Sequence, residues 1–171
     1  MTVPTLRTDR LTLRAPRLRD VRVVTKALND FNVSRWLTQV PFPYGMTDAE
    51  WFINECHRGN FTAWFIWADD DFVGTIGIDG ELGYWLAQDA WGKGFATEAG
   101  SAVLAHHFDT TEADEVRSSH FVENKGSQNV LTKLGFADVG AHAHFSKARG
   151  EDVAGRSMRL TRQGWQASRD A

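Results

Sequence analysis

The sequence is poor in cysteine and has no long apolar run, and these two features exclude several kinds of site and of protein. Among its 171 residues Cys56 is the single cysteine, which excludes an intramolecular disulfide and a cysteine-based zinc cluster. Cys56 falls in a helical pattern, where packing is favoured over a nucleophilic role. No apolar stretch approaches the ~20 residues of a membrane span, and the first residues contain no apolar signal core. We therefore expect a cytoplasmic protein without a membrane partner.

An excess of positive charge is also lacking. The 19 Lys and Arg residues are outnumbered by 22 Asp and Glu residues, which gives a net charge of −3. Binding to nucleic acid or to an anionic membrane calls for a basic excess, so we expect neither partner. The length suits one domain with a sizeable core, and no linker or repeat divides the chain, so residues 1–171 are predicted to form a single domain.

Hydrophobic periodicity predicts strands alternating with helices. Strand patterns occupy residues 11–14, 63–68, 72–78, 82–86, 116–122, 136–145 and 157–160, and helical patterns occupy residues 18–28, 33–37, 47–57, 96–108 and 128–134. Thr47 and Glu50 have the spacing of a capping box. The helix between the fourth and fifth strands implies one parallel crossover. The predicted fold class is α/β (α+β), with a mixed, mostly antiparallel six- to seven-stranded sheet flanked by helices.

The most informative segment runs from Trp85 to Ala99. An apolar strand leads into a loop with Gly92 and Gly94, and the loop leads into an amphipathic helix. Glycines let the backbone approach a bulky ligand, and the start of a helix presents unpaired N–H groups with a partial positive charge. Lys93 adds a mobile positive charge. The segment therefore predicts an anion site that suits a pyrophosphate.

Three kinds of phosphate-binding loop could have a segment like this one. A Walker loop needs G-x-x-x-x-G-K-[ST], which does not occur. A dinucleotide fingerprint needs a third glycine where Thr97 stands. The string Gly83-Tyr-Trp-Leu, followed by Trp91-Gly-Lys-Gly-Phe-Ala-Thr-Glu-Ala99, instead resembles the acetyl-coenzyme A loop of the GNAT N-acetyltransferases, in the RimJ/RimL-like branch that carries Trp at its first position. The alternative is a simple Gly-rich strand-to-helix turn that binds no ligand.

A second segment supports this resemblance. Residues 123–136, Glu-Asn-Lys-Gly-Ser-Gln-Asn-Val-Leu-Thr-Lys-Leu-Gly-Phe, are similar to the N-x-x-S-x-x-[VL]-x-x-K-x-G-F segment of RimJ/RimL-like enzymes. Arg10-Leu-Thr-Leu-Arg14 resembles the opening strand of that branch. The resemblance covers about residues 6–160 and implies a GNAT fold and an acetyltransferase.

The resemblance implies acetyl-CoA as cosubstrate and no metal. The amides of residues 92–97 are expected to hold the pyrophosphate, and the strand around Tyr84 is expected to pair with the pantetheine arm. Asn124 is expected to hydrogen-bond the cofactor. The residues expected to bind the cofactor are Tyr84, Trp85, Leu86, Trp91, Gly92, Lys93, Gly94, Phe95, Ala96, Thr97, Asn124 and Ser127.

The expected catalytic residues are Glu81 and Ser127. Many family members have a proton-donating Tyr in the helix before Lys-x-Gly-Phe, but Leu131 stands there. Ser127 is the nearest polar alternative, with a helix N-cap as its competing role. Glu81 resembles an acidic residue linked to amine deprotonation; its alternative is a solvated strand-end carboxylate. Asp79 is a weaker candidate.

The acceptor site is expected among aromatic residues. Trp36, Phe42, Tyr44 and Trp85 should line or flank it, with core packing as the alternative. His142 and His144 would share one strand face, where they are too few to hold a metal and favour a surface or acceptor role. The expected function is acetyl transfer to a primary amine, which is a protein or peptide N-terminal α-amine or a small amine. The alternative is a non-catalytic acyl-CoA-binding or interaction module. The branch commonly dimerises, so a homodimer is compatible with this reading.

Overall fold

The computed structural model describes residues 2–171. Its strands are β1 (Leu6–Arg7), β2 (Thr12–Arg14), β3 (Ala63–Ala68), β4 (Asp71–Ile78), β5 (Leu82–Leu86), β6 (Glu115–Phe121), β7 (Ala137–Ser146) and β8 (Glu151–Thr161). Its α-helices are α1 (Val21–Leu28), α2 (Phe31–Ser34), α3 (Met46–Arg58), α4 (Phe95–Thr110), α5 (Lys125–Lys133) and α6 (Arg162–Asp170). Two short 3-10 turns, η1 (Leu18–Asp20) and η2 (Gln88–Ala90), precede α1 and follow β5.

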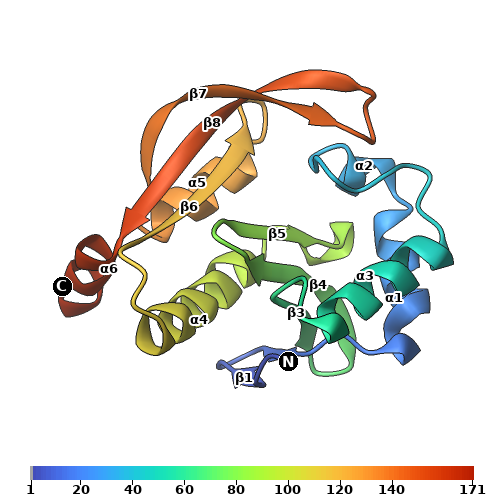
Figure 1. Ribbon diagram of the computed structural model, residues 1–171, viewed down its shortest axis with the longest axis horizontal. Helices are drawn as coiled ribbons and strands as arrows, with labels where there is room; N and C mark the ends of the chain where they lie inside the picture. Colours follow the sequence, from blue (N-terminus) through green and yellow to red (C-terminus); the bar gives the residue numbers. More distant parts are fainter. Residues whose placement is uncertain (1) are drawn as a thin grey trace.

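The strands form two antiparallel sheets that meet along β5 and β6 (Figure 1). One sheet has the order β1-β2-β3-β4-β5, and the other has the order β6-β8-β7. β5 and β6 run parallel and pair at a single bridge, between Glu81 and Arg117. Ser118 Oγ adds a hydrogen bond of 2.7 Å to Leu82 O beside that bridge. Beyond it β5 and β6 no longer pair within residues 2–171, so each has a free edge there.

Two hydrophobic cores cover opposite faces of the first sheet. The larger core packs α4 and α5 against both sheets and includes Val103, Leu131 and Leu160. The second core packs α1 and α3 on the other face and includes Val24 and Ile53. Successive residues of a strand point to opposite faces. Tyr84 accordingly packs against the first core, while its neighbour Trp85 packs against the second.

A close approach between α4 and α5 depends on one glycine. A Cβ added at Gly100 would lie 2.7 Å from Leu134 Cδ1, which is well inside van der Waals contact. Gly100 therefore lets α5 pack directly onto α4. This packing places Ser127, near the start of α5, on the same side of the sheet as the start of α4.

The structure corrects several expected element bounds. β1 and α6 were not anticipated; β1 has two residues, and α6 is mostly polar and buries only Trp165 among its described residues. The last strand begins at Glu151 rather than residue 157, because small and polar residues hide the alternation in its first half. The sheets contain eight strands rather than six or seven. The only parallel contact among residues 2–171 is the Glu81 bridge.

The expected capping box at Thr47 and Glu50 is wrong. The helix begins two residues earlier, with Gly45 as N-cap, and Asp48 Oδ2 accepts the Gly45 N–H at 2.8 Å. Asp48 has a shorter side chain than Glu50 but occupies the third helical position, from which a carboxylate reaches back to the cap.

None of the helices in residues 2–171 has both the length and the apolar character needed to cross a membrane.

Candidate active site

The loop between β5 and α4 presents a run of unpaired backbone N–H groups. Gly92 and Gly94 adopt φ values of +73° and +80°, a region that residues with side chains enter only with strain. The first helical hydrogen bond of α4 runs from Glu98 N to Gly94 O at 3.1 Å. Within residues 2–171 the amides of residues 92–97 donate to no other group. These donors converge at a helix N-terminus, which favours an anion.

Arg10, from the turn before β2, holds this loop in shape. Its Nη1 donates to Lys93 O at 2.8 Å, and its guanidinium carbon lies 4.7 Å from the centroid of the Phe95 ring. In a trans peptide the C=O and N–H groups point in opposite directions. Fixing the Lys93 carbonyl on Arg10 therefore turns the Gly94 N–H away from Arg10, toward the side where a ligand would bind.

Glu98 anchors Arg10 from the first turn of α4. Its carboxylate accepts from Arg10 Nε at 2.7 Å and from Thr8 Oγ1 at 2.5 Å. Burial raises the pKa of Glu98, but the hydrogen bonds from Thr8 and Arg10 outweigh it and lower the pKa overall. The contact therefore contributes stability above the ordinary carboxyl pKa. That contribution is lost as the pH falls through the lowered folded-state value.

We expect Arg10→Ala to weaken coenzyme A binding about tenfold, the size of a lost charge-assisted hydrogen bond. The fold should persist, because the Arg10 side chain is 49% exposed. Arg7→Ala is the matched control, since Arg7 lies on β1 and its side chain contacts Thr12 rather than the loop. Isothermal calorimetry with coenzyme A measures both. An Arg10→Ala protein with the parent's dissociation constant would show that the Lys93 contact does not shape the binding loop.

The edge of β5 that faces β6 has free backbone groups at Tyr84. Ala87 N bonds to Val73 O at 2.8 Å, so alternate residues of β5 pair with β4. The groups of Leu82, Tyr84 and Leu86 therefore face away from β4. Leu82 O accepts from Ser118, and Leu86 O accepts from Trp91 Nε1 at 2.9 Å. The N–H and C=O of Tyr84 remain, and they can pair with an extended ligand.

The Tyr84 side chain extends from β5 to α5, where its hydroxyl contacts Ser127. It lies 2.8 Å from Ser127 Oγ and 3.3 Å from Ser127 O. Burial raises the pKa of Tyr84 to about 12, with the Ser127 hydrogen bond acting in the opposite direction. The phenol therefore stays protonated throughout the neutral range. From the sequence, Tyr84 was expected only to pair with the pantetheine arm through its backbone. The structure adds a contact between its side-chain hydroxyl and Ser127.

The competing N-cap role of Ser127 is wrong. Asn124 is the N-cap of α5, and its Oδ1 accepts the Ser127 N–H at 3.1 Å. This leaves the Ser127 hydroxyl for Tyr84. The amide nitrogen of the Asn124 side chain donates to no group in residues 2–171, so it remains available for a ligand.

Glu81 lies at the start of β5, at the bridge to β6. It is exposed, and its carboxylate has no hydrogen-bond or ion-pair partner among the described residues. Glu81 is close enough to His142 of β7 to affect its ionisation. The pKa of His142 is lowered by burial and by His144, against a smaller raising effect of Glu81. His142 is therefore neutral at pH 7, with Nδ1 3.1 Å from Ser157 Oγ.

The four aromatic residues expected at the acceptor site have different surroundings. Tyr44 is only 6% exposed in the second core, where burial followed by the charge of Asp48 raises its pKa, and these surroundings favour the core-packing alternative for it. Phe42 is 40% exposed and packs on the Phe31 ring at 5.3 Å. Trp85 contacts Phe72, with ring centroids 5.8 Å apart. Trp36 is half-buried, and the guanidiniums of Arg35 and Arg149 lie over its ring.

Sequence patterns did not identify Arg10 and Glu98 as part of this site. They are separated by 88 positions in the sequence, so no local pattern pairs them. The remaining expected cofactor residues, from Trp91 to Thr97, do form one continuous surface loop and helix start. Within residues 2–171 no group of three or more His, Cys, Asp or Glu side chains could hold a metal ion.

Comparison with known proteins agrees with this geometry. The curated relatives include an N-acetyltransferase of Bacillus licheniformis named p20, itself uncharacterized, which is 29% identical over 159 residues, spanning 85% of this chain and 89% of the relative. RimJ of Mycobacterium smegmatis, solved with CoA-disulfide, superposes with a TM-score of 0.78 at 23% identity, covering 95% of this chain and 88% of RimJ.

A third similar protein is named for a different acceptor. Spermidine N-acetyltransferase of Vibrio cholerae, solved with CoA and spermine, superposes with a TM-score of 0.77 at 20% identity, covering 93% of this chain and 99% of that enzyme. At these identities the solved structures show the shared fold. The sequence model of the acetyltransferase (GNAT) domain matches residues 10–137, which include β2 to β6, the loop between β5 and α4, and α5. The chain therefore belongs to the GNAT family of acetyltransferases.

Proposed function

We propose that this protein transfers an acetyl group from acetyl-CoA to a primary amine by direct attack of the amine. The acceptor is a protein or peptide N-terminal α-amine or a small amine. The observation that carries the proposal is the run of unpaired amides at residues 92–97, shaped by two glycines with positive φ. RimJ and spermidine N-acetyltransferase are named with CoA in structures of the same fold, which supports the choice of donor.

The residues present fit coenzyme A. A Cβ added at Gly92 would meet nothing within 4 Å, so the loop surface is open to a ligand there. The amides of residues 92–97 would hold the pyrophosphate, with the Lys93 ammonium nearby. The free backbone groups of Tyr84 would pair with the pantetheine amides, and the Asn124 side-chain amide would donate beyond β6. Acetyl-CoA supplies the acetyl group already activated as a thioester.

Tyr84 and Ser127 are proposed to supply a proton to the leaving thiolate. The two hydroxyls are hydrogen-bonded to each other, so Ser127 can donate its proton outward as Tyr84 passes its own to Ser127, and solvent then returns a proton to Tyr84. A thiol has an ordinary pKa of about 8.5, so its thiolate leaves readily and needs only modest help. The Tyr that is missing from the helix is thus compensated by a Tyr on the neighbouring strand.

Glu81 is proposed to assist removal of the amine proton. Its exposed carboxylate lies at the bridge between β5 and β6, where the two sheets meet. At pH 7 an α-amine of pKa about 7.7–8.0 is about one-tenth neutral, whereas a Lys amine near 10.4 is far less so. The demand on Glu81 is therefore smallest for an α-amine. Trp36, Phe42 and Trp85 are proposed to flank this acceptor.

Steady-state release of the coenzyme A thiol tests the proposal. The parent should release thiol from acetyl-CoA only when an amine is added, and at least one member of a panel of peptides, amino acids and polyamines should be acetylated. Acetyl-CoA binding without amine-dependent release from any member would contradict catalysis. It would support the non-catalytic acyl-CoA-binding alternative.

We expect Tyr84→Phe and Ser127→Ala each to lower kcat by about tenfold or less, below the usual range for acid–base help, because the thiolate leaves well and water can replace one hydroxyl. The double variant should cost little more than either single change, since the two hydroxyls act as a unit. Single-turnover rates with saturating acetyl-CoA measure this. Losses that simply multiply in the double variant would show that the hydroxyls act independently.

A further inference from the structure

Three segments that are distant in the sequence meet at the indole of Trp36. The guanidinium carbon of Arg35, next to α2, lies 4.7 Å from the ring centroid. That of Arg149, in the turn between β7 and β8, lies 5.3 Å from it. Arg149 also lies 5.2 Å from the ring of Phe121 at the end of β6. Figure 1 shows the tip of the β7–β8 hairpin beside the α2 region, where Lys147 N bonds to Thr38 O at 3.0 Å.

Arg149 is buried but only partly satisfied. Its side chain is 10% exposed, and its Nε donates to Arg35 O at 2.8 Å. Its Nη1 lies 3.4 Å from Glu123 Oε2, a long contact to a carboxylate that is itself 61% exposed. Arg149 Nη2 is buried without a partner in residues 2–171. A buried cation normally has close partners for its donors, so this one has spare capacity for an anion.

Arg35 has even more spare capacity. Its guanidinium makes no hydrogen bond and no ion pair with any described residue, and its Nε is buried without a partner. A guanidinium carries five N–H donors. Because Arg35 forms no ion pair within residues 2–171, its charge does not stabilise the fold through one. Two guanidiniums on one indole repel each other unless an anion accompanies them, and Glu123 alone balances only one of them.

We propose that Arg35 and Arg149, stacked on Trp36, form a subsite for a carboxylate, and that the amine acceptor therefore carries a carboxylate. The subsite rests on the proposed function, because Trp36 belongs to the proposed acceptor region. The planar fork of a guanidinium matches a carboxylate in a bidentate arrangement. Two sources supply that chemistry: the α-carboxylate of a free amino acid, and an acidic side chain beside the N-terminal amine of a peptide.

Matched acceptors separate the two sources. One pair is the peptide amides Ser-Glu-Ala-Ala-Phe and Ser-Gln-Ala-Ala-Phe, in which the Glu side chain is the only carboxylate. The other pair is serine and serine amide. Each is titrated calorimetrically into the protein–coenzyme A complex, and kcat/KM is measured with acetyl-CoA. In at least one pair the carboxylate form should bind about tenfold more tightly, as expected for a charged hydrogen-bonded pair. The pair that shows the preference identifies the source.

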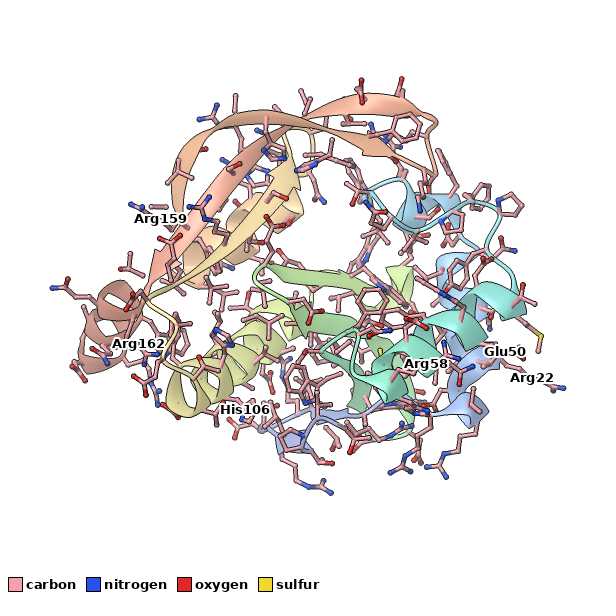
Figure 2. All side chains as sticks on the ribbon, in the orientation of Figure 1. Arg22, Glu50, Arg58, His106, Arg159 and Arg162 are labelled. Atoms are coloured by element: carbon pink, nitrogen blue, oxygen red, sulfur yellow. The ribbon has the colours of Figure 1, made fainter. Side chains whose placement is uncertain are left out.

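The preference should disappear in Arg35→Gln, which removes the charge without breaking a hydrogen bond of the fold. Arg22→Gln is the matched control, because Arg22 is an exposed arginine of α1 whose side chain also has no hydrogen-bond or ion-pair partner among residues 2–171 and points into solvent (Figure 2). That variant should keep the preference. Arg149→Lys should retain the turn better than a neutral residue and weaken the preference, since Lys lacks the fork.

Equal binding of both members in both pairs by the parent would overturn the subsite, as would tighter binding of the neutral members or no binding of any of the four. Persistence of the preference in Arg35→Gln would overturn it as well. A carboxylate preference in binding, without thiol release from acetyl-CoA, would leave the subsite standing and contradict the transferase activity instead.

Discussion

Replacing Gly94 with glutamate should raise the dissociation constant for coenzyme A on the order of 100-fold, because a carboxylate beside the loop amides repels the phosphates by about 2.7 kcal/mol of binding free energy. Gly94 has a φ of +80°, and a Cβ there would lie 3.4 Å from Arg10 Nη2. The new carboxylate would stand beside the amides of residues 92–97, where it would compete with the pyrophosphate for them and draw Arg10 away from Lys93 O. We expect no larger effect from any other single change.

Gly80→Glu is the control for backbone strain alone. Gly80 also has a φ of +80°, lies in the turn between β4 and β5, and has open space around its absent Cβ. Both variants should lose stability to a similar degree in thermal unfolding, but only Gly94→Glu should lose coenzyme A in calorimetry. A folded Gly94→Glu protein that binds coenzyme A as the parent does would remove the basis of the phosphate-loop assignment.

Glu81→Gln should lower kcat/KM for an α-amine acceptor by about 100-fold, the low end of the usual range for general acid–base help. The carboxylate takes up a proton that the attacking amine must lose, and glutamine cannot. The loss should shrink as the pH rises past the amine pKa of about 8, because the free base then forms without help.

The pH profile of kcat/KM for the parent and Glu81→Gln measures this effect. Glu50→Gln is the matched control, because Glu50 is an exposed glutamate of α3 whose side chain points into solvent (Figure 2). The control should follow the parent at every pH. If the Glu81→Gln profile also overlays that of the parent, Glu81 is a surface carboxylate, and positioning of the two substrates accounts for the catalysis.

The shape of the loop between β5 and α4 could be predicted from the sequence because its requirements are local. Gly92, Gly94 and the start of α4 are neighbours in the chain, and each contributes through backbone geometry that a sequence pattern reports directly. The antiparallel meander of β3 to β5 was equally accessible, since its strands are joined by short turns and alternate clearly.

The remainder of the site depends on contacts between distant segments. Tyr84 could be placed on a strand, but its hydrogen bond with Ser127 arises only because α5 packs back against β5, across 43 positions. The Arg149 contact with Arg35 spans 114 positions, and the expected acceptor residue Tyr44 became a core residue through the same kind of packing. A sequence pattern cannot report such pairs, because no spacing rule connects them.

The most direct test of the account is the response of the backbone amides of residues 92–97 to coenzyme A. In a 15N-labelled protein followed by NMR, these amides should show the largest chemical-shift changes on titration with coenzyme A, and their hydrogen exchange should slow as the pyrophosphate accepts their protons. The Gly80 amide should change little. Saturable coenzyme A binding that leaves the amides of residues 92–97 unshifted and still exchanging freely would contradict the account.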